Sequence, residues 1–291
     1  MHATKKLIVP FLLPGILIVL VLFIFPAFQT VIVSLQDWYG TFRTTGFVGF
    51  KNYLDIATDP LFTQSVLTTF KYFFLSLLLL FPSALFLAVS LTKIKTGRLV
   101  IEFLIFAPVV LSVVVASILW KFIYDPNMGL LTPALKAIGL GSIVPIWLGD
   151  PSTALVAVTI VTIWHGISTW VILIMSGIDR IPTQFAEAAR MEGASGFVVF
   201  FRITLPLLWE VLSTLIILWF IQAMQTFPFI YIMTNGGPFG TTEVMGTYMY
   251  KVAFVGRMFS YGSAMAIIMA LIILVFSLLG SKLIKREVYE F

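Results

Sequence analysis

Residues 154–176 read ALVAVTIVTIWHGISTWVILIMS, a run without a single Asp, Glu, Lys or Arg. A helix that crosses a bilayer needs about 20 mostly apolar residues, so this run is long enough to span one. Other stretches meet the same requirement, and the sequence therefore predicts an all-α, polytopic membrane protein with six transmembrane helices. The predicted spans are Ile8–Leu35, Val66–Leu91, Leu99–Phe122, Ala154–Ser176, Leu207–Met233 and Tyr261–Ile284.

The composition of the 291-residue chain supports this fold class. Hydrophobic residues make up 60% of the chain and charged residues 11%, whereas a soluble domain is about 45–50% apolar and about 25% charged. These values exclude a soluble enzyme core and a disordered chain. No polar stretch is long enough to bury a core of its own, so we expect residues 1–291 to form a single transmembrane domain.

The net charge of +5 has two readings, a nucleic-acid binder or a membrane protein with basic cytoplasmic connections. The second fits better, because the bases gather in connections that share one side of a six-span chain. We therefore expect no nucleic-acid partner, a multi-pass location in the cell membrane and both termini in the cytoplasm. A signal peptide is disfavoured because the first apolar stretch is too long. The cations in the segments predicted to be cytoplasmic are Lys5, Lys6, Lys93, Lys95, Arg98, Arg180, Arg190, Arg202, Lys282, Lys285 and Arg286.

The inventory of reactive residues disfavours an enzyme. The sequence has no Cys, no GxxxxGK[ST] phosphate loop and no GxSxG nucleophile elbow. We therefore expect no catalytic residue and no metal site. A stand-alone carrier driven by protons or sodium remains the alternative, and it would need a relay of Asp, Glu or His inside the bilayer. Glu102 and Glu210 lie near predicted helix ends, and His165 has no His or Cys near it in sequence.

The connection over about residues 177–206 predicts two short helices in the longest cytoplasmic loop. Pro182 marks the start of the first helix, Thr183 is its expected N-cap, and helix formers fill Gln184–Glu192. Gly193 is expected to end it. The second helix covers Phe197–Ile203, before Pro206 opens the fifth span. From the residues alone, a solvated amphipathic loop on the lipid headgroups is an equal alternative to a surface that binds another protein.

This loop carries a pattern with fixed spacing. It contains Glu187-Ala188-Ala189, then Gly193 after three residues, Ile203 after nine more, and Leu205-Pro206. The pattern resembles the complete EAA motif of binding-protein-dependent ABC importer permeases. It also stands where that family has it, in a cytoplasmic loop before the penultimate span.

Further resemblance covers nearly the whole chain. Residues 47–53, FVGFKNY, are similar to the FVGLxNY stretch of carbohydrate-uptake permeases, with Phe50 in place of Leu. Residues 125–131 and 147–151 are similar to that family's third connection. Residues 234–238, TNGGP, resemble the outer loop of the maltose- and glycerol-3-phosphate-type first permease. Before Gly193, Met191-Glu192 replaces the more usual hydrophobic-Asp pair.

The resemblance implies a type I ABC importer permease that imports a sugar, a related polyol or a glycerol phosphate. It implies three kinds of partner: a second homologous permease, two ATP-binding cassette subunits and an extracytoplasmic solute-binding protein. ATP and Mg would bind to the ATPase subunits, so this chain would hold no cofactor. The residues implied in coupling to the ATPases are Glu187, Ala188, Ala189, Arg190, Gly193, Ile203, Leu205 and Pro206.

Polar and aromatic residues within the fourth and fifth spans are candidates for the substrate pathway, because polar groups at membrane depth are costly. Resemblance to the maltose-type pocket implies that seven positions face it. The alternative is hydrogen bonding between helices of the bundle, and for His165 packing is favoured over ligand binding. The sequence does not identify the sugar. The implied positions are His165, Gly166, Thr169, Trp219, Gln222, Ala223 and Thr226.

Overall fold

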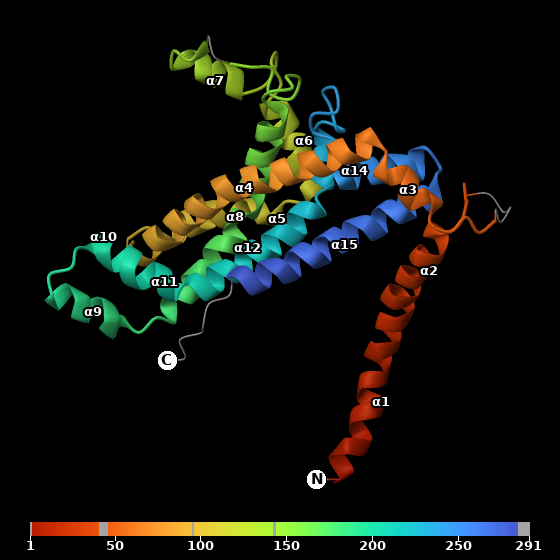
Figure 1. The fold of residues 1–291 in the computed structure, drawn as a ribbon. Helices are drawn as coiled ribbons and strands as arrows, with labels where there is room; N and C mark the ends of the chain where they lie inside the picture. The colour runs from red at the N-terminus through yellow and green to blue at the C-terminus, as the bar shows by residue number, and fades with distance from the viewer. Residues whose placement is uncertain (1, 41–45, 95, 142–143, 285–291) are drawn as a thin grey trace. The chain divides into compact units, whose positions relative to one another are not determined.

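The computed structural model describes residues 2–40, 46–94, 96–141 and 144–284 (Figure 1). Helices dominate these residues, and the β pairing found among them is an isolated antiparallel bridge between Gln36 and Phe47. Lys95, Lys285 and Arg286, three of the cations on which the predicted topology depends, lie outside the described residues. In chain order, with η for π-helical segments, the elements are α1 His2–Val19, η1 Leu20–Ile24, α2 Phe25–Ser34, α3 Lys51–Ala57, α4 Pro60–Lys93, α5 Arg98–Val110, α6 Val113–Ile123, α7 Leu131–Ala137, α8 Ala154–Asp179, α9 Thr183–Met191, α10 Gly196–Val199, η3 Phe200–Thr204, α11 Leu205–Leu207, α12 Trp209–Met224, α13 Pro228–Met233, α14 Met245–Tyr250, η4 Lys251–Val255 and α15 Phe259–Ile284.

The prediction of an all-α, polytopic chain is confirmed. Four helical segments are long and apolar enough to cross a membrane: Phe11–Ser34, Pro60–Lys93, Ala154–Asp179 and Phe259–Leu283. Two bent helix pairs pass the same test, α5 with α6 and the segment Gly196–Leu207 with α12. The described part of the chain therefore reaches six spans when each bent pair counts as one.

The third and fifth spans differ from the continuous helices predicted for them. The third bends by 104° between α5 and α6, where Leu111 and Ser112 adopt extended backbone angles. The fifth bends by 63° at Leu208, and its helix stops at Met224 before α13 begins at Pro228. Pro228 accounts for the latter stop, because proline has no N–H to donate to the Met224 carbonyl four residues earlier and its ring clashes with that carbonyl in a continuous helix.

The described residues fall into two compact units, one from those up to Thr63 together with Tyr248–Ile272 and the other from those between Gln64 and Thr247 together with those after Ile272. In the first unit, hydrogen bonds tie the connection after α2 to α3. The Asn52 amide donates to the carbonyls of Ser34 and Gln36 at 2.8 and 2.9 Å. The hydroxyls of Ser34 and Tyr53 lie 2.6 Å apart.

Asp59 organises the N-terminal end of α4 within the same unit. One carboxylate oxygen accepts hydrogen bonds from the backbone amides of Leu61 and Phe62 at 2.9 and 3.3 Å, and so caps the helix. The other accepts from the hydroxyls of Tyr248 and Tyr261 at 2.7 and 3.1 Å. Burial opposes ionisation of Asp59, but these hydrogen bonds outweigh it and hold the pKa of Asp59 below its usual value.

We expect Asp59→Ala to lower the midpoint of thermal unfolding in detergent, because loss of an N-cap alone costs about 1–2 kcal/mol. Asp59→Asn keeps a capping oxygen and should lose much less. Since the folded-state pKa is depressed, the stabilisation by wild-type Asp59 is complete above the unfolded pKa of about 3.9. It disappears as the pH falls through the folded pKa. The wild-type and Asp59→Ala midpoints should therefore differ at pH 7 and converge in acid; equal midpoints at pH 7 would contradict this role.

Contacts between α4 and α12 form part of the core of the second unit. The Trp219 indole donates to the Ser76 hydroxyl at 2.9 Å, and the rings of Phe73 and Phe220 meet edge to face at 5.1 Å. Helix α12 also packs against α8, and α8 packs against α5 and α6. These helices hold the pocket described below.

Candidate functional site

Helix α9 lies where the first helix of the connection over residues 177–206 was predicted. Pro182 is its N-cap residue and no side chain caps it; the expectation that Thr183 is the N-cap was wrong, because Thr183 is already helical. At the other end Gly193 has a left-handed φ of +85°. The amide of Ala194 donates to the Ala189 carbonyl at 2.9 Å and that of Gly193 to the Arg190 carbonyl at 3.0 Å. These two bonds form a Schellman motif, so Gly193 ends the helix.

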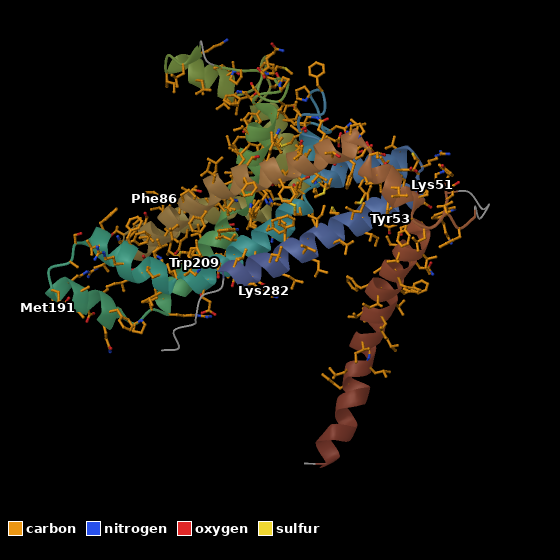
Figure 2. The ribbon with its side chains drawn as sticks, viewed as in Figure 1. Lys51, Tyr53, Phe86, Met191, Trp209 and Lys282 are labelled. Atoms are coloured by element: carbon orange, nitrogen blue, oxygen red, sulfur yellow. The ribbon has the colours of Figure 1, made fainter. Side chains whose placement is uncertain are left out.

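The predicted coupling residues of α9 lie on an accessible helix. Glu187, Ala188 and Arg190 are exposed, and Ala189 is half-buried. Met191, at the end of the helix, is 89% exposed, and Figure 2 shows it at the far end of the loop. The helix therefore presents small residues and charges of both signs to the surroundings of this chain.

The second half of the loop is helical but irregular. The Ser195 hydroxyl caps α10 by accepting from the Val198 amide at 3.4 Å. Ile203 is half-buried in η3, and α11 holds Leu205, half-buried, and Pro206, exposed. The predicted helix Phe197–Ile203 therefore extends at both ends, and the chain bends at Leu208, two residues after Pro206.

The helices on either side of the loop meet closely at Gly177. A Cβ atom at this position would lie 3.0 Å from side-chain carbons of both Leu208 and Val211. Gly177 is buried in α8, and Leu208 has no exposed surface. A side chain at position 177 would therefore push α8 away from the start of α12.

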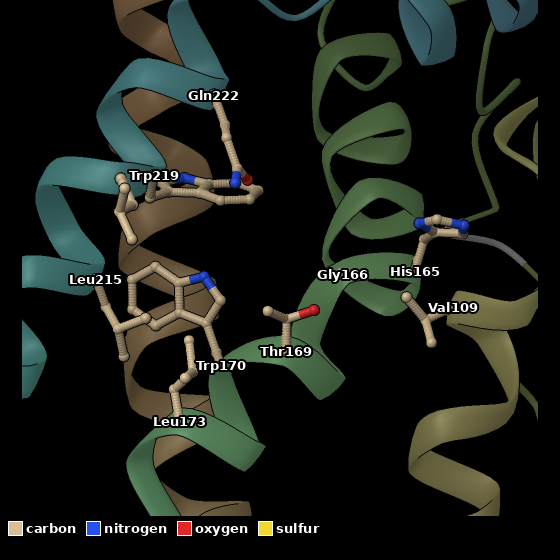
Figure 3. A pocket seen from close by; sticks show the side chains of 10 residues that line it. Val109, His165, Gly166, Thr169, Trp170, Leu173, Leu215, Trp219 and Gln222 are labelled. Carbon is tan, nitrogen blue, oxygen red and sulfur yellow. The ribbon is translucent and has the colours of Figure 1, made fainter. Parts of the chain in front are cut away.

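A cavity of about 210 Å³ lies between α8, α12 and the end of α5. Five of the seven predicted pathway residues line it. Figure 3 shows Trp170 and Trp219 on one side of the cavity and His165 and Val109 on the other. The lining residues are Val109, His165, Gly166, Thr169, Trp170, Leu173, Leu215, Leu218, Trp219 and Gln222.

Two tryptophans give this cavity a fixed aromatic wall. The rings of Trp170 and Trp219 meet edge to face at 6.1 Å, and the bond from Trp219 to Ser76 holds the second ring in place. Thr169 and Gln222 are exposed and add a hydroxyl and an amide. The lining contains no Lys, Arg, Asp or Glu. Aromatic faces combined with neutral polar groups suit an uncharged ring that carries hydroxyls.

The remaining predicted residues have structural surroundings. Ala223 and Thr226 are 1% and 8% exposed and lie outside the lining. His165 lines the cavity, but its Nε2 lies 2.9 Å from the Leu111 carbonyl. Among the residues that the structure describes, no group of three or more His, Asp or Glu is placed to hold a metal ion.

Half of the lining residues were not predicted from the sequence, because most of them are apolar. Trp170 and Leu173 follow Gly166 at helical spacing, and Leu215 and Leu218 precede Trp219 and Gln222 in the same way. A search three or four residues before and after each predicted residue would have identified them, because such residues share a face of the helix. Val109 carried no such signal, because the bend after α5 brings it to the cavity.

Comparison with known proteins agrees with this architecture. The family described as binding-protein-dependent transport system inner membrane component matches residues 7–287. The chain is 35% identical over 277 residues to the probable ABC transporter permease protein YurN of Bacillus subtilis, with 94% of each chain covered. It is 31% identical to the trehalose/maltose transport system permease protein MalF of Thermococcus litoralis, covering 93% of this chain and 91% of that one.

A solved structure shows the same fold. It is the crystal structure of a bacterial ABC transporter involved in the import of the acidic polysaccharide alginate, and one of its chains superposes with a TM-score of 0.85 at 22% identity. The superposition covers 97% of this chain and 96% of the other. The described helices, the sequence match along almost the whole chain and this likeness agree, and the chain therefore belongs to the family of inner membrane components of binding-protein-dependent transport systems.

Proposed function

We propose that this chain is one permease of an ATP-driven, binding-protein-dependent importer of an uncharged sugar or polyol. It works beside a second homologous permease and above two ATPase subunits, which bind ATP and Mg. A solute-binding protein delivers the ligand from outside, and both termini face the cytoplasm. The chain itself catalyses no reaction and holds no cofactor.

The exposure of helix α9 and its connection to two spans are the observation that carries this proposal. This helix is exposed and joined at both ends to membrane-spanning helices that touch at Gly177. A partner that binds α9 therefore acts directly on α8 and α12, the helices that line the cavity. Rigid-body movement of packed helices is an established way to switch such a protein between two states.

The lining of the cavity supports an uncharged ligand. A charged group that leaves water needs a partner of opposite charge or a large compensation in hydrogen bonds. The lining offers two indole rings, a hydroxyl and an amide, and no fixed charge. A neutral sugar or polyol therefore fits this half of the pathway better than a glycerol phosphate.

Purification of the tagged chain from its native membranes in mild detergent tests the proposal. We expect a homologous permease and an ATPase to remain bound to the wild-type chain. Glu187→Lys reverses a charge on the exposed face of α9. A misplaced charge at an interface costs several kcal/mol, so ATPase recovery should fall by about tenfold or more.

The matched control is Asp55→Lys, the same change of charge at an exposed residue of α3. It should retain the ATPase at the wild-type level. Recovery of the wild-type chain alone or as a homo-oligomer would contradict the importer and would favour a carrier driven by protons or sodium. Equal ATPase recovery with Glu187→Lys and wild type would contradict the role of α9 alone.

A further inference from the structure

Two membrane helices of the second unit are interrupted beside the cavity. Between α5 and α6 the chain bends by 104° at Leu111 and Ser112. Between α12 and α13, residues 225–227 leave the helix. An interruption at membrane depth frees backbone groups that lipid cannot hydrogen-bond, so neighbouring protein groups must satisfy or cover them.

A side chain from α8 satisfies the first interruption. The Nε2 atom of His165 lies 2.9 Å from the Leu111 carbonyl oxygen. Because a carbonyl can only accept, Nε2 of His165 is the donor in this hydrogen bond. The Ser112 hydroxyl satisfies a further backbone group at this interruption, because it accepts a hydrogen bond from the Val115 amide at 3.3 Å.

The second interruption is partly buried and is followed by a residue that contacts α8. Thr226, inside the interruption, is 8% exposed. Just beyond it, the ring of Phe229 meets His165 edge to face at 5.4 Å.

Both interruptions therefore contact one residue of α8. His165 meets the first through the Leu111 carbonyl and the second through the ring of Phe229. Helix α8 continues without a break to Asp179 and reaches α9 through Arg180–Pro182. A displacement of α9 along or about the axis of α8 would reach both interruptions through His165.

We propose that His165 is the positioning residue that transmits movement of α9 to the two interrupted spans. The inference rests on the proposed function, in which partner subunits move α9. When α8 shifts, the Leu111 carbonyl follows His165, and the angle between α5 and α6 changes. Val109, two residues before Leu111, then moves relative to the α8 wall of the cavity. This makes His165 a part of the transmission rather than a ligand group.

Distance measurements between spin labels test this directly, because the chain has no native Cys. Phe103→Cys on α5 and Leu119→Cys on α6 place labels at exposed positions on either side of the first interruption. Distances are measured by electron paramagnetic resonance in the assembled importer, first without nucleotide and then trapped with ATP and vanadate. We expect the wild-type distance to change between the two states.

Three variants separate the hydrogen bond from general packing. His165→Phe keeps a ring against Phe229 and removes the donor, whereas His165→Gln restores a donor nitrogen. Loss of one hydrogen bond should reduce the population at the wild-type distance about two- to tenfold. We expect this loss, and loss of the nucleotide response, with His165→Phe and largely wild-type behaviour with His165→Gln. Ser176→Ala, an exposed position on the same helix, is the control and should match wild type.

A wild-type distance distribution in His165→Phe would overturn the inference. If that variant does not fold, the wild-type comparison still decides, because an unchanged distance in an importer that hydrolyses ATP would also overturn it. The outcome is distinct from failure of the proposed function, which would appear earlier as a chain that purifies without an ATPase.

Discussion

The variant Gly166→Trp is expected to assemble with its partners and to lose uptake of the imported ligand. Gly166 lines the cavity, and a Cβ atom built on it meets nothing within 4 Å. The backbone can therefore carry a side chain, but an indole would occupy much of the 210 Å³ available to ligand. Uptake should be measured with the carbon source whose use is lost when the gene for this chain is deleted.

Gly280→Trp is the matched control for this occlusion. Gly280 also lies in a membrane-spanning helix with nothing within 4 Å of a built Cβ, and it does not line the cavity. We expect it to retain uptake and the same amount of chain in the membrane. If Gly166→Trp and Gly280→Trp transported equally well, the cavity could not belong to the pathway.

The second large effect is expected for Gly193→Ala, which should weaken the attachment of ATPase subunits. Gly193 holds a φ of +85° at the end of α9, and an L-residue in the left-handed region costs about 1–2 kcal/mol. That cost corresponds to a factor of about 5–30 in the population of the correctly ended helix. ATPase activity recovered with the purified chain should fall accordingly.

Gly196→Ala separates backbone strain from loss of a glycine as such. Both glycines are exposed in the same loop with no atom within 4 Å of a built Cβ, but Gly196 does not have a left-handed φ. Its replacement should leave ATPase recovery unchanged. A similar loss in both variants would mean that the Schellman end of α9 is not what the partner needs.

The sequence predicted where the apolar helices lie but not where they are interrupted. Local hydrophobicity is enough to locate a span, because the bilayer requires a fixed length of apolar chain. The interruption at Leu111 depends on a distant residue, since His165 supplies its hydrogen bond. By contrast, Pro228 is a signal in the sequence for the stop before α13. The expectation of one unbroken span from Leu207 to Met233 did not use that signal.

The functional residues divide in the same way. The end of α9 follows from glycine chemistry at Gly193, so spacing along the chain was sufficient to predict it. The cavity depends on three-dimensional packing, and a search for polar groups found His165, Thr169 and Gln222 but not the apolar half of the lining. The role of His165 at the bend required the structure, because Leu111 takes part through its backbone.

The close approach at Gly177 has a consequence for how the two helices move. A Cβ atom at position 177 would lie 3.0 Å from side-chain carbons of Leu208 and Val211, so the absence of a side chain at Gly177 is what lets α8 and the start of α12 pack this closely. Because the two helices are in direct contact here, we expect a partner that moves the intervening loop to move α8 and the start of α12 together as a packed pair.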